Sequence, residues 1–258
     1  MNEEYLKFAK SIAREAKCIM LKYFKGDIIE TKLKIDNTVV TKADVEINTY
    51  LIERVKENYP SHAVIGEEET YRKSKYSWVC DPLDGTKMYS LHIPVSVFSL
   101  ALVYSGEPII GVVYDPFTDN LYSAIKGKGA YRNEVKISVN EIELDDSINS
   151  VADFEMWPSC TYDMYKVVCE LGRKSYFVNI GSIIRASVAV ASGKFTFAIF
   201  PGKTCHDIAA VKIIVEEAGG KVTDLLGNEQ RYDRNINGAV ISNALVHNEI
   251  INTVKKFY

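Results

Sequence analysis

The spacing of apolar residues changes along the chain, and these changes limit the folds that it can adopt. Residues 3–24 and about 44–58 carry apolar side chains at helical spacing, which predicts two amphipathic helices. The chain then changes to short apolar runs broken by turn residues, which are typical of buried strands and a meander. The predicted strands of this part occupy residues 63–65, 77–80, 94–104, 108–114 and 120–124.

Beyond the polar stretch 140–150, apolar segments of strand and helix character alternate. Strands are predicted near 150–154, 176–178, 195–199, 221–223 and 239–241, with helices at 161–171, 182–191, 207–218 and from 246. Alternation of this kind favours a layered α/β arrangement. We therefore predict an N-terminal α+β subdomain, residues 1–140, followed by a C-terminal α/β subdomain, residues 141–258.

Composition excludes several classes of protein. The chain has 258 residues, of which 47% are hydrophobic, enough for one large core or two smaller ones. Its net charge of −3 gives no basic footprint for nucleic acid. The most apolar stretches are too short and interrupted to span a bilayer. Five scattered cysteines fit a reducing compartment better than a disulfide framework. We expect a cytoplasmic protein that binds neither nucleic acid nor membrane.

The segment Asp81-Pro82-Leu83-Asp84-Gly85-Thr86 carries the strongest chemical signal. It places two carboxylates three positions apart after an apolar run, and its proline is expected to end the strand there. Two aspartates and the Leu83 carbonyl are oxygen ligands of the kind that Mg²⁺ prefers. Gly85 and Thr86 can open a helix and offer N–H groups to an anion. Alone, the segment is equally well a surface turn.

Three further elements place carboxylates near the ends of predicted strands or the starts of predicted helices. The run Glu67–Glu69 follows a strand, and for Glu68 and Glu69 a solvated acidic loop is the better interpretation. Asp44 and Asp207 stand at the starts of helices, where N-capping is the simplest alternative. In this order, however, the four elements have the pattern of a composite metal site.

Together these elements resemble the inositol monophosphatase superfamily, which includes fructose-1,6-bisphosphatases of the same fold and 3′-phosphoadenosine 5′-phosphate phosphatases. The resemblance covers essentially the whole chain. It implies a layered α-β-α-β-α sandwich of the sugar-phosphatase type, a homodimer and Mg²⁺-dependent hydrolysis of a small phosphate monoester by an activated water. The segments that carry it are Val40–Asp44, Gly66–Glu68, Trp78–Thr86, Gly111–Pro116, Gly127–Tyr131, Asp207–Ala210 and Glu217–Asp224.

The resemblance also implies roles for individual residues. Two to three Mg²⁺ ions would be held by Glu67, Asp81, the Leu83 carbonyl, Asp84 and Asp207. Thr86, Asp44 and Glu67 would be catalytic, with Thr86 and Asp44 orienting the attacking water. Substrate contacts would come from Gly85, Thr86, Asp84, Gly181 and Ser182. Apart from the resemblance, Lys203 could meet a second anionic group of a substrate, although a solvated loop lysine is the better interpretation. The weakly held ion site implies inhibition by lithium.

The sequence departs from the family's pattern at two positions near the last metal ligand. His206 stands where a tryptophan is usual, and its ring can still pack against the site. Phe200 stands where inositol monophosphatases have an acidic residue that binds an inositol hydroxyl. Lys87 after the Asp-Gly-Thr run looks instead like the adenine-nucleotide branch. The substrate therefore stays open between an inositol or sugar phosphate and 3′-phosphoadenosine 5′-phosphate, and a regulatory protein without turnover is a remoter alternative.

Overall fold

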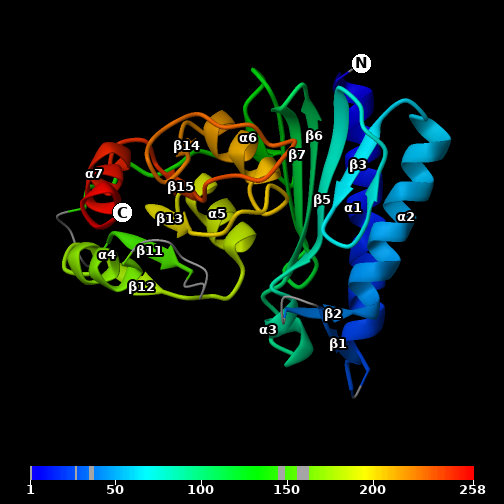
Figure 1. The fold of residues 1–258 in the computed structure, drawn as a ribbon, viewed down its shortest axis with the longest axis horizontal. Helices are drawn as coiled ribbons and strands as arrows, with labels where there is room; N and C mark the ends of the chain where they lie inside the picture. The colour runs from blue at the N-terminus through cyan, green and yellow to red at the C-terminus, as the bar shows by residue number, and fades with distance from the viewer. Residues whose placement is uncertain (1, 27, 35–37, 145–148, 156–162) are drawn as a thin grey trace.

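The computed structural model describes residues 2–26, 28–34, 38–144, 149–155 and 163–258. Its elements form five layers, in which helices and sheets alternate (Figure 1). The layered α-β-α-β-α fold predicted from the resemblance is therefore confirmed. The division into subdomains at residue 140 stays a prediction, although the two main sheets lie on either side of it in the sequence.

The helices fall into three layers. The first layer is α1 (Asn2–Phe24) and α2 (Lys42–Asn58), the middle layer α5 (Ile183–Ala191) and α6 (Ala209–Glu217), and the last α4 (Met164–Leu171) and α7 (His247–Phe257). A short helix, α3 (Thr86–Ser90), follows the Asp81–Asp84 segment. The helix predicted at 161–171 begins at Met164, and residues 161 and 162 lie outside the described part of the chain.

The larger sheet has eight strands in the order β10-β9-β8-β7-β6-β5-β3-β4. They are β3 (Ala63–Gly66), β4 (Thr70–Tyr71), β5 (Tyr76–Asp84), β6 (Val97–Tyr104), β7 (Glu107–Asp115), β8 (Asn120–Ile125), β9 (Ala130–Arg132) and β10 (Val135–Lys136). Apolar side chains alternate between its two faces, as the two-residue period of a strand requires. On β6, Phe98, Leu100 and Leu102 pack toward α1 and α2, whereas Val97, Ala101 and Val103 pack toward α5 and α6.

The smaller sheet has five strands in the order β12-β11-β13-β15-β14. They are β11 (Val151–Phe154), β12 (Tyr176–Val178), β13 (Phe197–Phe200), β14 (Lys221–Thr223) and β15 (Ala239–Ser242). The strands β12, β11 and β13 are parallel, so their carboxyl ends meet at one edge. A separate hairpin of β1 (Thr31–Leu33) and β2 (Val39–Thr41) lies beside α3 in Figure 1.

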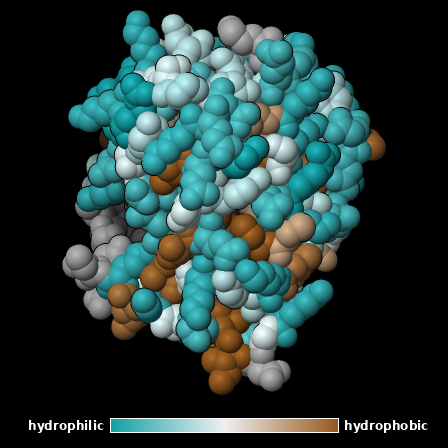
Figure 2. Space-filling view, turned by 90° about the vertical axis from the view of Figure 1, so that its right-hand side faces the viewer, coloured by the Kyte–Doolittle hydropathy of each residue, from teal (hydrophilic) through white to brown (hydrophobic). Residues whose placement is uncertain are grey.

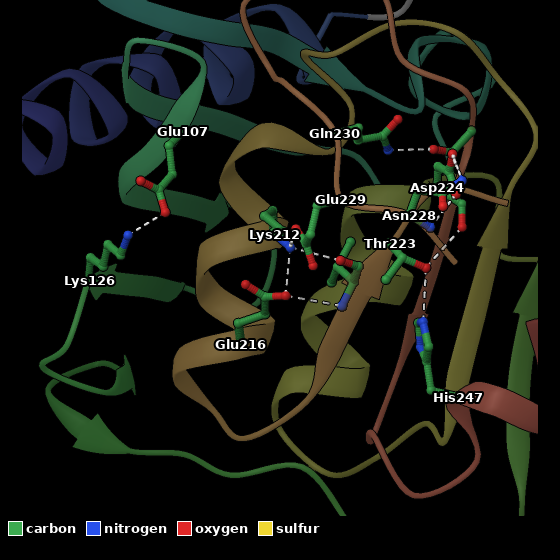
Figure 3. A network of polar contacts seen from close by, with 12 residues as sticks. Glu107, Lys126, Lys212, Glu216, Thr223, Asp224, Asn228, Glu229, Gln230 and His247 are labelled. Carbon is green, nitrogen blue, oxygen red and sulfur yellow. Dashed lines mark hydrogen bonds and ion pairs between the residues drawn. The ribbon is translucent and has the colours of Figure 1, made fainter. Parts of the chain in front are cut away.

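A polar network fixes α6 against the strand that follows it (Figure 3). Lys212 is almost fully buried, and its ammonium lies 2.7 Å from both Glu216 and Glu229. Next to it, the ring of His247 forms a hydrogen bond with Thr223, and burial lowers the pKa of this histidine to about 4. The network therefore anchors the helix that begins two residues after Asp207.

The face formed by the α2 side of the molecule is mostly hydrophilic, with apolar side chains gathered in its lower half (Figure 2). The elements at that end of the molecule are the β1–β2 hairpin and α3. Ile28, Leu33 and Leu91 are strongly exposed there. None of the described helices is both long and apolar enough to cross a membrane.

Candidate active site

A cavity of about 560 Å³ brings together residues from the large sheet, the β1–β2 hairpin and the small sheet. Four predicted metal ligands, Glu67, Asp81, Leu83 and Asp84, come from β5 and the segment after β3. The fifth, Asp207, comes from the segment after β13. The cavity lining also includes Leu33, Lys34, Thr38, Val39, Gly85, Thr86, Lys87, Glu155, Gly181, Thr204 and His206.

A bulge in β5 explains how both aspartates of the Asp81–Asp84 segment reach the cavity. The strand was predicted to end at Asp81, but it continues to Asp84. Opposite β6, Asp81 pairs with Ser99 and Asp84 with Val97, so β5 has one extra residue in this interval. Residues three apart on a regular strand face opposite sides, and the extra residue cancels that difference. Pro82, which lacks an N–H, fits this interruption.

Asp84 is held from behind by the start of α5. Its Oδ2 atom accepts hydrogen bonds from the Ser182 hydroxyl and from the Ile184 amide, the latter at 2.8 Å. Ser182 was predicted to contact the substrate, but it is fully buried and does not line the cavity. Its hydroxyl orients the Asp84 carboxylate, which is a positioning role, and a direct contact between Ser182 and the substrate stays a prediction.

Asp81, Asp84 and Asp207 form a cluster of buried carboxylates. One oxygen from each lies within 4.8 Å of the others. Burial, reinforced by the neighbouring negative charges, raises the pKa of all three well above its usual value. Among the described residues, no lysine or arginine forms an ion pair with them. Buried carboxylates of like charge need a compensating positive charge, and a hard divalent cation prefers oxygen ligands. The three carboxylates therefore fit Mg²⁺.

A second acidic group contains Asp44, Glu67 and Glu68, whose oxygens also lie within 4.8 Å of one another. The ammonium of Lys34 lies 2.6 Å from both Glu67 and Glu68. Although burial opposes it, these two carboxylates raise the pKa of Lys34 and keep it charged. Glu68 was interpreted as a solvated loop residue; it is instead half-buried and paired. In this conformation Glu67 is grouped with Asp44 and Glu68, and Asp81 with the other two aspartates.

Asp44 takes part in the cap of α2 and also lies beside Thr86. Its Oδ2 atom accepts hydrogen bonds from the Thr41 amide and hydroxyl, which completes a capping box at the start of α2. The single proton of the Thr86 hydroxyl has two acceptors within reach, the Asp44 Oδ1 atom at 3.2 Å and the Leu83 carbonyl at 2.8 Å. Burial, opposed by the Thr41 hydrogen bonds and reinforced by Glu67, raises the pKa of Asp44 to about 7. The predicted Thr86–Asp44 pair is therefore present.

Of the other residues predicted to contact the substrate, some line the cavity and one does not. Gly85 and Gly181 line the cavity; a side chain at Gly85 would meet the Gly181 carbonyl at 2.8 Å, and its φ of 84° also favours glycine. Lys203 is exposed and lies outside the cavity lining, as the solvated-loop alternative requires. Phe200 is fully buried, because its position on β13 turns it toward α5 and α6.

Several cavity residues carry no prediction from the sequence. Lys34, Thr204 and Glu155 are among them. His206 does line the cavity, as its proposed packing requires, and burial lowers the pKa of its ring. A usable signal existed for Glu155, because it directly follows a predicted strand, and such positions collect at the carboxyl edge of a parallel sheet.

Comparison with known proteins agrees with this geometry. A family model described as the inositol monophosphatase family matches residues 1–257. The chain is 28% identical to the fructose-1,6-bisphosphatase/inositol-1-monophosphatase of Thermotoga maritima, over 96% of this chain and 94% of that protein. It is 31% identical to Nus factor SuhB of Haemophilus influenzae, over 97% of this chain and 95% of that protein. The solved structure of Thermotoga maritima IMPase has a TM-score of 0.87 at 27% identity and covers 98% of this chain and 97% of its own. The chain therefore belongs to the inositol monophosphatase family.

Proposed function

We propose that this protein is a Mg²⁺-dependent phosphatase that hydrolyses a small phosphate monoester of the inositol or sugar phosphate type. The observation that supports this most is the buried cluster of Asp81, Asp84 and Asp207, which lies in the same cavity as Gly85 and Thr86. A cation site beside backbone groups that can hold an anion is what a phosphate monoester requires.

Asp81, Asp84 and Asp207, with Glu67 and the Leu83 carbonyl, would hold two to three Mg²⁺ ions. When bound, the ions supply positive charge that lowers the pKa of water and stabilises a leaving oxygen. Ser182 and the Ile184 amide keep one Asp84 oxygen occupied, so its other oxygen is left to face the cation.

Thr86 and Asp44 supply the proton path. The Thr86 hydroxyl is fixed between the Leu83 carbonyl and Asp44, and it lines the cavity. It can orient a water molecule and accept its proton while passing its own to Asp44. A pKa of about 7 suits Asp44 to this exchange near neutral pH. Gly85 and Thr86 would hold the phosphoryl oxygens through their backbone amides.

Phosphate release from a panel of inositol, fructose, histidinol and adenine-nucleotide phosphates tests the proposal. We expect release that requires Mg²⁺, stops with EDTA and is inhibited by lithium. An Asp207→Asn variant should be inactive, because it removes a carboxylate of the buried cluster. Wild-type protein that releases no phosphate from any ester in Mg²⁺ would refute the proposal.

Relatives named Nus factor SuhB favour, as a second candidate, a regulatory protein of this fold that does not depend on turnover. Hydrolysis of 3′-phosphoadenosine 5′-phosphate is the alternative within the enzyme class, and competition by adenosine monophosphate would reveal it. We further propose a cytoplasmic homodimer. Sedimentation equilibrium should give twice the mass of 29.0 kDa for one chain.

A further inference from the structure

Glu155 follows the central strand of the three parallel strands in the small sheet. Because β12, β11 and β13 are parallel, the segments that leave their carboxyl ends meet at one edge, which is the usual ligand edge of such sheets. Gly181 follows β12, Glu155 follows β11 and Asp207 follows β13, and all three line the cavity. The topology therefore places Glu155 between two residues that border the predicted phosphate site.

The register of β11 determines on which face of the small sheet each of its side chains lies. Phe154 pairs with Ile199, and both pack into the outer core beneath α4 and α7. Asp153, one residue earlier, faces the opposite side, where it accepts a hydrogen bond from the Ile180 amide. Glu155 lines the cavity on that side. Its charge is near enough to raise the pKa of Asp84 and Asp207, so it stands within electrostatic reach of the carboxylate cluster.

Glu155 is nevertheless distinct from the candidate metal ligands. Among the described residues, the groups whose oxygens lie within 4.8 Å of one another are the cluster of Asp81, Asp84 and Asp207 and the group of Asp44, Glu67 and Glu68. Glu155 belongs to neither. A carboxylate in the cavity lining, near the candidate cation site but outside its ligand set, is placed to meet the rest of a bound ester.

The chemistry of a carboxylate restricts what it can meet. When ionised it accepts hydrogen bonds and donates none, so it favours hydroxyl groups and repels a second anion. The cavity lining also includes Gly181, which has no side chain, and Thr204, whose hydroxyl is already directed to Asp207. Phe200, at the neighbouring position of β13, is buried in the core and offers no polar atom.

We propose that Glu155 is a specificity-determining residue, whose carboxylate accepts hydrogen bonds from the hydroxyl groups of a polyol or sugar monophosphate. The inference rests on the proposed function only in treating this cavity as the phosphate ester site. It selects polyhydroxylated esters over aromatic ones, and it disfavours a bisphosphate whose second phosphate would lie beside Glu155.

The test compares Glu155→Ala and Glu155→Gln with the wild type on two monoesters, inositol 1-phosphate and phenyl phosphate, which has no hydroxyl group. We expect Glu155→Ala to lower kcat/KM for inositol 1-phosphate at least tenfold, mainly through KM, and to change phenyl phosphate less than twofold. Glu155→Gln, which keeps one acceptor oxygen, should lie between. The exposed Glu141→Gln makes the same change in net charge and should behave as wild type.

A second measurement separates this inference from the proposed function. The rise in Tm caused by inositol 1-phosphate and by inorganic phosphate is measured in Mg²⁺ for the same variants. If the wild type hydrolyses nothing, the proposed hydrolysis fails, and a selective loss of the inositol 1-phosphate shift in Glu155→Ala still supports the role of Glu155. Equal losses on both esters, with a higher Mg²⁺ requirement, would show that Glu155 acts through the cations. That result, or no loss at all, overturns the inference.

Discussion

Replacing Asp84 by asparagine separates metal binding from folding, because Asp84 both accepts hydrogen bonds from the start of α5 and lines the cavity. The side-chain oxygen of the asparagine can keep the hydrogen bonds from Ser182 and the Ile184 amide. Its NH₂ group then replaces the second carboxylate oxygen, and the negative charge beside Asp81 and Asp207 is lost. Without metal, the change removes repulsion among buried carboxylates, so Asp84→Asn should be more stable than the wild type in EDTA.

The size of the effect follows from the spacing. Two unit charges 4.8 Å apart, the upper limit of the spacing in this cluster, repel by about 3.5 kcal/mol at an effective dielectric constant of about 20. Proton uptake relieves part of this, so we expect a gain of about 1–3 kcal/mol in the free energy of unfolding at pH 8. For a chain of this size that corresponds to a rise in Tm of about 2–4 °C per kcal/mol.

The pH dependence has a definite sign. Because folding raises the pKa of Asp84, the folded wild type binds more protons than the unfolded chain above about pH 4. Its stability in EDTA therefore falls as the pH rises through the raised pKa. The advantage of Asp84→Asn should be largest at pH 8 and vanish near pH 4. In saturating Mg²⁺ the order should reverse, and the variant should release no phosphate.

Thermal and urea unfolding in EDTA and in Mg²⁺ measure these differences. Asp115→Asn is the matched control, because Asp115 is also buried but forms an ion pair with Arg185 at 2.8 Å and accepts a hydrogen bond from the Phe117 amide. It should destabilise the protein in both conditions. If Asp84→Asn is less stable than the wild type in EDTA at pH 8 while the control behaves as expected, repulsion does not dominate this cluster.

Three further substitutions test other parts of the site. Thr86→Val should lower kcat about 10²-fold with little change in stability, because it removes the hydroxyl between Asp44 and the cavity. Single-turnover phosphate release measures this effect, and full activity would refute the proton path. Lys34→Gln should lower the half-saturating Mg²⁺ concentration about fivefold, because the metal ion no longer competes with an ammonium for Glu67. Lys34→Arg, which keeps the positive charge, is the control. An unchanged Mg²⁺ titration of Lys34→Gln would contradict this competition. Phe200→Glu should destabilise the protein by several kcal/mol in urea unfolding, because the new charge is buried in the core. It should not improve inositol phosphate turnover. A stable variant with raised turnover would place residue 200 in the cavity.

The order of helices and strands could be predicted to within a few residues, since it depends on local periodicity. The short strands β1, β2, β4, β9 and β10, each of two or three residues, were not predicted. The continuation of β5 to Asp84 was missed because proline usually ends a strand, whereas here it lies in a bulge. The two predicted helix starts differ as well: Asp44 completes a capping box, but Ile208, and not Asp207, is the N-cap of α6.

The sequence by itself determined the layered fold and which carboxylates are candidate metal ligands, because both follow from local periodicity and from motifs that resemble one family. The tertiary structure alone decided what each carboxylate faces. It turned Ser182 behind Asp84, buried Phe200 on the inner face of β13 and set Lys34 against Glu67. It also brought Glu155 into the cavity. These outcomes depend on strand register and on which face a residue occupies, and they involve partners too distant in the sequence for any local pattern to specify.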